Sequence, residues 1–226
     1  MRYGKGAVLV RQLKERRLAR LRGLYAIVDD SAAWPPLELL RAFLRGGAAV
    51  VQLRLKAFPA RDLCEVAREA VAVCRPRDVL LLVNDRPDVA RAAGADGVHL
   101  GQEDLPAGAA REVLGADALI GVSTHSDAEI DAATAAGADY LGFGPVFETR
   151  SKRGARLPAP HGLAGLERAV RRAAPLPVVA IGGLTAWSVG GVARAGAACA
   201  AAIGEICHAP DPESAARALA EAFTRG

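Results

Sequence analysis

The stretch VLLLVNDRPDVARAAGADGVHLG, residues 79–101, contains the pattern that decides the fold. The apolar run over 79–84 is typical of a fully buried strand, and a second apolar run covers 97–101. Between them, Gly94 stands where a helix commonly ends in glycine. The stretch therefore predicts a strand, a helix and a second strand, which is the unit from which parallel sheets are built.

The same alternation continues along the chain. Further apolar runs cover 24–29, 49–55, 119–124, 140–146, 177–183 and 198–204. Segments with helical spacing include 37–47, 60–74, 127–137, 163–174 and 211–223, and glycines at expected helix ends are Gly46, Gly47, Gly94, Gly137 and Gly196. Eight strand–helix units in 226 residues predict one α/β domain, a (β/α)8 TIM barrel. A doubly wound open sheet is the alternative, although no glycine-rich dinucleotide fingerprint follows the first strand.

Positive charge is concentrated at the N-terminus. Residues 1–22 carry a net charge of +7 and the whole chain +4, so residues 23–226 sum to −3. This balance argues against a nucleic-acid interface on the folded body. We predict a basic N-terminal extension over 1–22 and a catalytic barrel over 23–226. A solvated helix or an irregular start is the simplest interpretation of the extension, and contact with RNA or an acidic surface, or a transit peptide, are the alternatives.

Composition also bears on the expected location. No apolar stretch approaches the roughly 18 residues of a membrane span, and no signal-peptide pattern is present, so we expect a cytoplasmic enzyme without a membrane partner. The four cysteines lack metal-type spacing, which fits a reducing compartment. The sequence leaves open whether the chain forms a homo-oligomer.

Asp85 directly follows the buried run over 79–84, where a strand core has no use for a carboxylate. In a (β/α)8 barrel, binding and catalytic side chains lie at the C-terminal ends of the strands, so we expect Asp85 at the mouth. The same rule collects residues at the other strand ends, namely Gln52, Arg54, Lys56, Asn84, His99, Asp104, Ser123, His125, Thr149, Ser151, Lys152, Gly182, Gly183, Ile203 and Gly204.

Two groups at this mouth indicate anion binding. The alternation of the second strand puts Gln52, Arg54 and Lys56 on one side, expected to face the barrel interior, where buried cations are costly unless anions compensate them. Phosphate oxygens fit that role, and a structural ion pair with a neighbouring acid is the alternative. Backbone N–H groups at Gly183 and Gly204 could form a second anion site, with plain tight turns as the alternative. Two such sites indicate two phosphorylated substrates.

Asp85 and Asp104 follow adjacent strands and form a candidate metal site. One or two carboxylates, completed by substrate phosphates, are typical of Mg²⁺. A salt-bridge network with the neighbouring cations is the alternative.

Several blocks of the sequence resemble the thiamine-phosphate synthase family, within the superfamily that also contains thiazole tautomerases. The matching blocks are VQLRLK (51–56), LLVNDRPDVA (81–90), ADGVHLGQEDLP (95–106), IGVSTHS (120–126), ADYLGFGPVFETRSK (138–152) and VVAIGGLT (178–185). The resemblance runs from about residue 23 to the end of the chain. It implies a barrel enzyme that joins a hydroxymethylpyrimidine diphosphate to a thiazole phosphate, giving thiamine phosphate and diphosphate by a dissociative, Mg²⁺-assisted substitution.

The resemblance also implies roles for individual residues. Asp85 and Asp104 would bind Mg²⁺. The pyrimidine diphosphate would be held by Gln52, Arg54, Lys56, Asn84, Ser123 and Lys152, with His99 lining the pyrimidine pocket. The thiazole phosphate would contact Thr149, Ser151, Gly183, Ile203 and Gly204. Of these, Arg54, Lys56, Ser123 and Lys152 are the expected catalytic residues, because they would neutralise or orient the leaving diphosphate.

The sequence departs from the family pattern around the thiazole side. Glu148 adds an anion, Ser151 stands where a threonine is usual, the loop after Lys152 is longer, and Gly204 stands where serine is common. Two other functions stay open: a thiazole tautomerase, which would use His125 as acid and base, and a non-catalytic phosphate-binding regulatory barrel. The intact set of cations and carboxylates favours the synthase.

Overall fold

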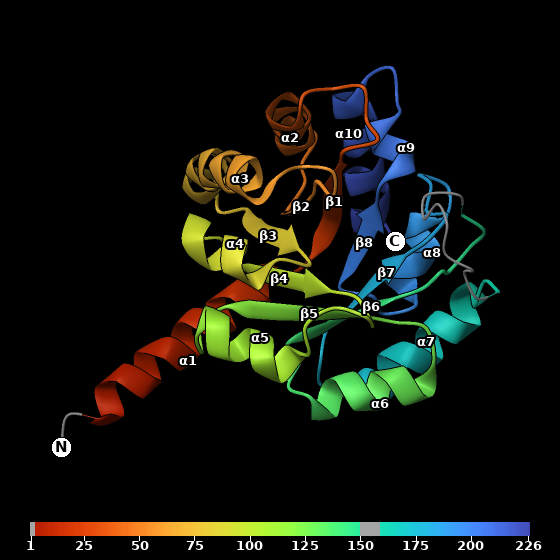
Figure 1. Cartoon of the computed structure of the whole chain (residues 1–226). Coiled ribbons are helices and arrows are strands. Elements are labelled where there is room, and N and C mark those ends of the chain that lie inside the picture. The colour runs from red at the N-terminus through yellow and green to blue at the C-terminus, as the bar shows by residue number, and fades with distance from the viewer. Residues whose placement is uncertain (1–2, 150–158) are drawn as a thin grey trace.

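The computed structural model, which describes residues 3–149 and 159–226, is a closed barrel of parallel strands (Figure 1). Within those residues eight strands pair in chain order, and β1 pairs with β8 to close the ring. The strands are β1 (Gly23–Asp29), β2 (Val50–Arg54), β3 (Leu80–Asn84), β4 (Gly97–Leu100), β5 (Leu119–Thr124), β6 (Tyr140–Phe143), β7 (Val178–Ile181) and β8 (Cys199–Ala202). The predicted TIM barrel is confirmed, and the open sheet is excluded because β1 and β8 are not free edges.

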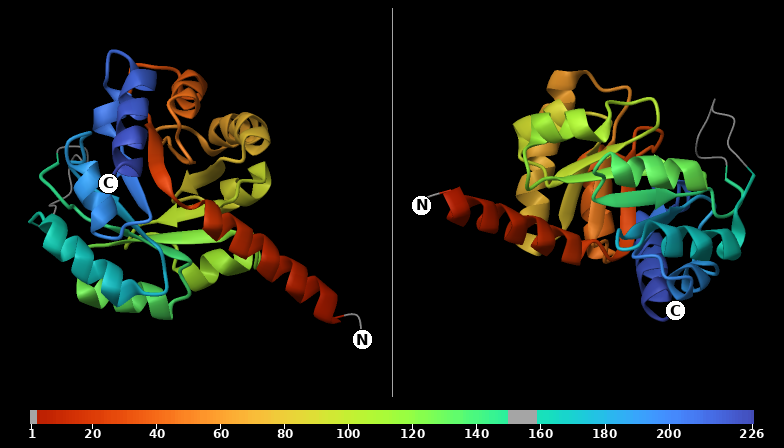
Figure 2. Two further views of the ribbon diagram at one scale, coloured as in Figure 1. Left: turned by 180° about the vertical axis from the view of Figure 1, so that it is seen from behind. Right: turned by 90° about the horizontal axis from the view of Figure 1, so that it is seen from below.

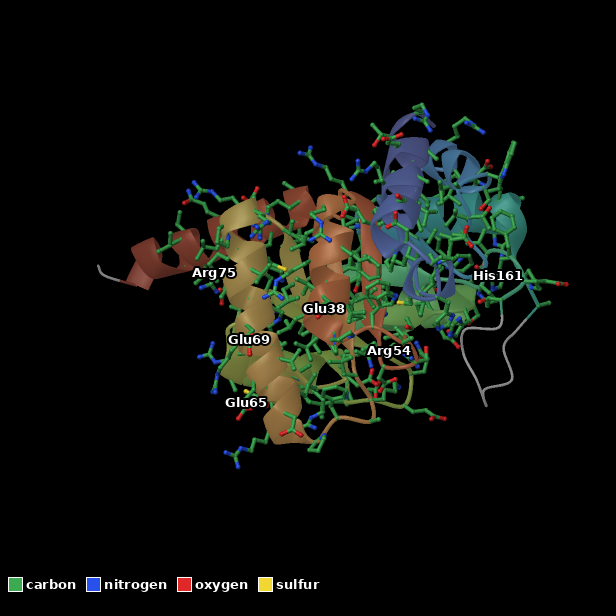
Figure 3. The ribbon with its side chains drawn as sticks, turned by 90° about the horizontal axis from the view of Figure 1, so that it is seen from above. Glu38, Arg54, Glu65, Glu69, Arg75 and His161 are labelled. Atoms are coloured by element: carbon green, nitrogen blue, oxygen red, sulfur yellow. The ribbon has the colours of Figure 1, made fainter. Side chains whose placement is uncertain are left out.

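Helices cover the outside of this barrel. They are α2 (Pro36–Arg45), α3 (Ala60–Cys74), α4 (Pro87–Ala93), α5 (Ala107–Leu114), α6 (Asp127–Ala135), α7 (Gly162–Ala173), α8 (Val189–Arg194), α9 (Gly204–Cys207) and α10 (Pro212–Thr224), with the 3-10 helix η1 (Arg75–Arg77) after α3. On α3, Leu63, Ala67 and Ala70 are buried, whereas Glu65 and Glu69 are exposed (Figure 3). This spacing gives the helix one apolar face toward the barrel.

Successive side chains of each strand alternate between two cores. Tyr25, Leu80 and Leu82 belong to the cluster that fills the barrel, whereas Leu24 and Leu81 belong to the cluster between barrel and helices. The strands are therefore buried on both faces, which explains their continuous apolar sequence. Polar residues are left with the strand ends or with hydrogen-bonded positions inside the barrel.

The basic extension forms helix α1 (Tyr3–Arg20), which projects beyond the barrel at its first residues (Figure 2). Its second half docks on the side of the barrel opposite the mouth. There its basic side chains pair with aspartates that precede β3 to β6, as in Arg20 with Asp78, Arg17 with Asp96 and Asp117, and Lys14 with Asp139. The interpretation as a solvated helix therefore holds only for the first half, where Val8 and Leu9 are exposed. Across the described parts of the chain, no helix combines the length and apolar character needed to cross a membrane.

Candidate active site

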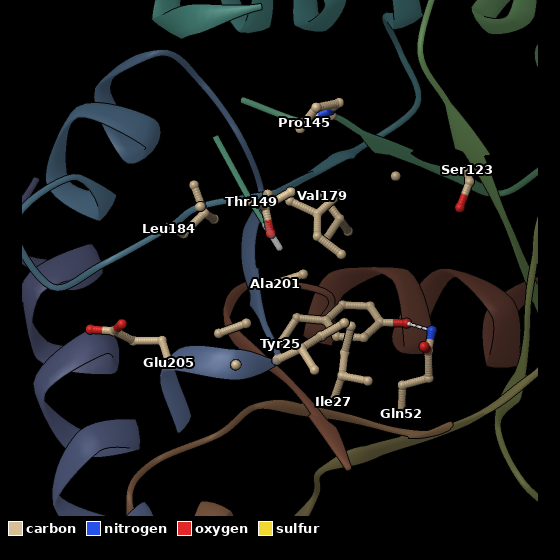
Figure 4. Close-up of a pocket in the computed structure, with 18 of the residues that line it drawn as sticks. Tyr25, Ile27, Gln52, Ser123, Pro145, Thr149, Val179, Leu184, Ala201 and Glu205 are labelled. Atoms are coloured by element: carbon tan, nitrogen blue, oxygen red, sulfur yellow. Dashed lines mark hydrogen bonds between the residues drawn. The ribbon is translucent and has the colours of Figure 1, made fainter. Parts of the chain in front are cut away.

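A pocket of about 340 Å³ opens at the C-terminal ends of the strands (Figure 4). The predicted substrate-binding residues that line it are Gln52, Arg54, Asn84, His99, Ser123, Thr149, Gly183, Ile203 and Gly204. Ser151 and Lys152 lie outside the described residues. Because these side chains come from distant parts of the chain and converge in one hollow, the pocket is the candidate active site.

Asp85 turns the chain from β3 toward α4 in an uncommon backbone conformation. Its φ is +60°, in the left-handed region that aspartate tolerates better than most residues. The backbone N–H of Asp85 donates to the carbonyl of His99 at 2.9 Å, which ties the turn to β4. The carboxylate is 2.9 Å from Lys56 Nζ. These contacts fix the Asp85 side chain at the end of β3, next to the pocket residue Asn84.

Asp85 and Asp104 lie close enough for each carboxylate to shift the pKa of the other, as adjacent strand ends predict. Burial and then Asp85 raise the pKa of Asp104 above its ordinary value, whereas the effect of burial on Asp85 is outweighed by Lys56 and Asp104, so its pKa is lowered. Asp104 Oδ2 also accepts from the backbone N–H of Gly101 at 2.6 Å. Two carboxylates forced together in this way fit a divalent cation, whose charge would relieve their repulsion.

The carboxylates would supply only part of a coordination shell. No group of three or more His, Cys, Asp or Glu side chains placed to hold a metal occurs within residues 3–149 and 159–226. Mg²⁺ commonly uses one or two carboxylates and takes its other ligands from water and substrate phosphates. The residues present therefore fit Mg²⁺ bound together with a phosphorylated ligand.

Arg54 lines the pocket at the end of β2, and its guanidinium pairs with the buried carboxylate of Asp29. Asp29 also accepts from the backbone N–H of Ser31 at 3.0 Å and from its hydroxyl. Burial alone would raise the pKa of Asp29, but Ser31 and Arg54 outweigh it, and the pKa lies below its ordinary value. The ion pair occupies one side of the guanidinium. The alternative prediction for Arg54, a structural ion pair with a neighbouring acid, therefore holds for this side.

Lys56 corrects the prediction that the whole Gln-Leu-Arg-Leu-Lys segment faces the barrel interior. Strand β2 ends at Arg54, so the period of two no longer applies two residues later. The Lys56 side chain is 55% exposed and pairs with Asp85 beside the pocket. It does not line the pocket within the part of the chain that the structure describes.

The floor of the pocket contains polar side chains that face inward from several strands. Gln52 is buried and donates through Nε2 to the hydroxyl of Tyr25 at 2.7 Å. The two ring nitrogens of His99 are 3.0 Å from Tyr140 OH and 3.0 Å from Ser123 Oγ. The predicted residues Gln52, His99 and Ser123 are therefore brought together around two tyrosines.

The other side of the pocket is formed by the loops after β6, β7 and β8. Thr149, Ile203 and Gly204 line it, as does Glu148. Gly183 has a φ of +64°, and a Cβ there would lie 2.2 Å from the carbonyl oxygen of Glu148. Close packing of the two loops therefore requires this glycine, whatever ligand its N–H meets.

Sequence reasoning missed three residues that shape the site. Asp29 ends the first strand, so the strand-end rule could have included it. Tyr25 and Tyr140 each carry a hydroxyl within a buried apolar run, and this is the signal that indicates an internal hydrogen bond. Nothing local in the sequence says that the two hydroxyls meet each other.

A (β/α)8 barrel with cations, paired carboxylates and a deep pocket at its mouth has the architecture of an enzyme that acts on phosphorylated small molecules. The chain matches the family described as Thiamine monophosphate synthase over residues 24–206. It belongs to that family.

Individual relatives agree with this assignment. The chain is 50% identical over 211 residues to the thiamine-phosphate synthase of Anaeromyxobacter dehalogenans, covering 93% of this chain and 91% of the relative. It is 46% identical over 204 residues to that of Moorella thermoacetica, covering 89% and 96%. The solved structure of thiamine phosphate pyrophosphorylase from Pyrococcus furiosus has a TM-score of 0.83 and 37% identity, covering 92% of this chain and 98% of that one.

Proposed function

We propose that this protein is a Mg²⁺-dependent transferase that joins 4-amino-2-methyl-5-hydroxymethylpyrimidine diphosphate to a thiazole phosphate, giving thiamine phosphate and diphosphate. Family membership and relatives of similar length support the reaction. The observation that carries the assignment of the site is the cluster at the mouth, where Arg54, Lys56, Asp85 and Asp104 lie next to one pocket. The free cysteines suit a cytoplasmic location.

The pyrimidine diphosphate binds on the β2–β5 side of the pocket. Gln52, Asn84, His99 and Ser123 surround the ring, and Arg54 with Lys56 holds the diphosphate. Asp85 and Asp104 would hold Mg²⁺, whose charge would neutralise that of the departing diphosphate. The C–O bond breaks first, and the cation left on the pyrimidine methylene is stabilised by the ring amino group.

The thiazole phosphate binds on the β6–β8 side. Thr149, Ser151 and the backbone at Gly183, Ile203 and Gly204 hold its phosphate, which aims the thiazole nitrogen at the pyrimidine methylene carbon. Lys152 joins Arg54 and Lys56 at the diphosphate. The side chains orient both substrates and exclude water, so no protein nucleophile is needed.

Thiazole tautomerisation is the second candidate, because His125 also lines the pocket. His125 Nδ1 lies 2.5 Å from the carbonyl oxygen of Gly144, and it donates there because a carbonyl can only accept. In a neutral imidazole, Nε2 would then be the nitrogen that accepts a proton.

The deciding experiment supplies purified protein with the pyrimidine diphosphate, Mg²⁺, and either the thiazole phosphate or its carboxylated form. We expect thiamine phosphate to form, and to disappear with EDTA and in Asp85→Ala. Asp62→Ala on the exposed side of α3 is the matched control and should retain activity. Isomerisation of the carboxylated thiazole without pyrimidine or metal, abolished by His125→Ala, would favour the tautomerase. Binding of phosphorylated ligands without either reaction would favour a regulatory barrel.

A further inference from the structure

A chain of hydrogen bonds crosses the barrel interior beneath the pocket. Gln52 Nε2 lies 2.7 Å from Tyr25 OH, and that hydroxyl lies 3.2 Å from Tyr140 OH. Tyr140 OH is 3.0 Å from His99 Nδ1, and His99 Nε2 is 3.0 Å from Ser123 Oγ. Figure 4 shows the Gln52–Tyr25 contact as a dashed line, with Ser123 on another strand of the pocket wall. The network thus links three proposed substrate-binding residues, Gln52, His99 and Ser123, through two tyrosines.

Two glycines leave the space that the side chains of this network occupy. A Cβ at Gly121 would lie 2.0 Å from Tyr140 Cζ, and a Cβ at Gly142 would lie 2.9 Å from His99 Cε1. Tyr25 is 1% exposed and Tyr140 0%. Hydroxyl groups so deeply buried need partners inside the protein, so the contacts form a fixed network.

The amide nitrogen of Gln52 can only donate, and this fixes which atom donates in each hydrogen bond of the network. The amide nitrogen of Gln52 donates to Tyr25, so the Tyr25 oxygen accepts there. Its other partner among the described residues is Tyr140, and the Tyr25 proton therefore goes to Tyr140. Tyr140 in turn donates to Nδ1 of His99. Burial raises the pKa of both phenols, so each keeps the proton that it donates.

The last step concerns the imidazole. A neutral imidazole that accepts at Nδ1 carries its proton on Nε2, and this nitrogen faces Ser123 Oγ. We propose that Tyr140, whose hydroxyl is oriented by Tyr25, is a positioning residue that holds His99 as the Nε2–H tautomer and so makes the Ser123 hydroxyl a hydrogen-bond donor to the substrate. The Ser123 oxygen accepts from His99, and its own proton is left for an acceptor in the pocket, such as a ring nitrogen or a phosphate oxygen.

The role of Ser123 toward substrate rests on the proposed function, but the tautomer of His99 is a property of the free protein. It can be read by ¹⁵N NMR of protein labelled at histidine, with His99 assigned by its loss in His99→Gln. We expect the neutral Nε2–H form. In Tyr140→Phe, which loses only the donor to Nδ1, a substantial fraction should change to the Nδ1–H form.

Tyr25→Phe is the matched control, because it removes the same atom one step further from the imidazole. Tyr140 still donates to His99 in that variant, so the Nε2–H tautomer should persist. A doubly protonated or Nδ1–H His99 in the unmodified protein would overturn the proposal, as would an unchanged tautomer in folded Tyr140→Phe. If Tyr140→Phe does not fold, the tautomer of His99 in the unmodified protein tests the proposal by itself, and only the neutral Nε2–H form supports it.

Steady-state kinetics test the connection to Ser123. If Tyr140 acts through Ser123, Tyr140→Phe should lower kcat/KM about tenfold, the scale of one lost hydrogen bond, and have little further effect in a Ser123→Ala background. Fully additive losses would overturn the connection. An inactive protein with the expected tautomer would refute the proposed function and leave the proton order standing.

Discussion

Arg17 gives the sharpest test of how helix α1 is held on the barrel. Its Nη1 is 2.6 Å from the carbonyl oxygen of Asp117 and 2.8 Å from Oδ2 of the same residue, and its Nε is 3.1 Å from Asp96 Oδ1. We expect Arg17→Ala to release the second half of α1 and leave both aspartates without this partner.

The size of the effect follows from the geometry. A hydrogen bond to a charged group contributes about 1.5–3 kcal/mol, whereas an exposed ion pair contributes about 0–1 kcal/mol. The Arg17 side chain is 22% exposed, so its hydrogen bonds to charged groups are only partly open to solvent. We therefore expect Arg17→Ala to lower the free energy of unfolding by about 2 kcal/mol.

The assay is urea unfolding followed by circular dichroism, with Arg11→Ala as the control. Arg11 lies on the same helix and pairs with Glu15 at 2.8 Å, but its side chain is 82% exposed, so its loss should leave the free energy of unfolding almost unchanged. Equal stabilities of the two variants would refute the docking of α1 through Arg17. A loss that persists unchanged in high salt would refute its electrostatic origin.

Two further predictions concern the pocket. Asp29→Asn should raise KM for the pyrimidine diphosphate, because Arg54 loses the carboxylate that orients it. The folded-state pKa of Asp29 is lowered, so its carboxylate stabilises the fold above the unfolded pKa of about 3.9, and this stabilisation is lost as pH falls toward the folded value. The difference in Tm between the unmodified protein and Asp29→Asn should therefore be largest near neutral pH and small in acid. A difference that does not change with pH would contradict this. Gly121→Ala should lower the free energy of unfolding by about 1–3 kcal/mol, because its Cβ would displace the ring of Tyr140. In the control Gly108→Ala on α5, a Cβ meets nothing within 4 Å, so this variant should be slightly more stable. Equal urea midpoints of the two variants would contradict this.

The sequence predicts the barrel and the location of its site for a physical reason. Strands buried on both faces need continuous apolar runs, so charged residues such as Asp85 and Asp104 are left at or just after the strand ends. The exposure of Lys56 could not be predicted, because it depends on β2 ending at Arg54. The meeting of Tyr25 with Tyr140 depends on how inward side chains from opposite parts of the barrel cross its interior, which no local pattern encodes.

The docking of α1 on the barrel could not be predicted from the sequence either. The basic residues of the extension are evident, but their partners are single aspartates spread along the chain, each just before a strand. Only the barrel brings Asp96 and Asp117 onto one face, where Arg17 reaches both. Long-range ion pairs of this kind follow from topology, so a run of positive charge by itself predicts a solvated helix equally well.

The charges at the mouth explain why metal and diphosphate should bind together. Arg54 and Lys56 face three carboxylates, those of Asp29, Asp85 and Asp104, so this cluster has a formal charge of −1. A diphosphate approaching it must compete with carboxylates that already hold both cations. A divalent cation held by Asp85 and Asp104 would reverse the sign. Two unit charges about 4 Å apart interact by about 4 kcal/mol at an effective dielectric constant of about 20.

Because coupling between two ligands is reciprocal, Mg²⁺ should raise the affinity for diphosphate by the same factor as diphosphate raises the affinity for Mg²⁺. Calorimetric titration with inorganic diphosphate, with and without Mg²⁺, measures this factor without any turnover. Asp104→Asn should weaken the coupling, because it removes one of the two carboxylates that would share the ion. Diphosphate binding that is equally tight in EDTA would show that the cations, although paired with acids, are sufficient by themselves.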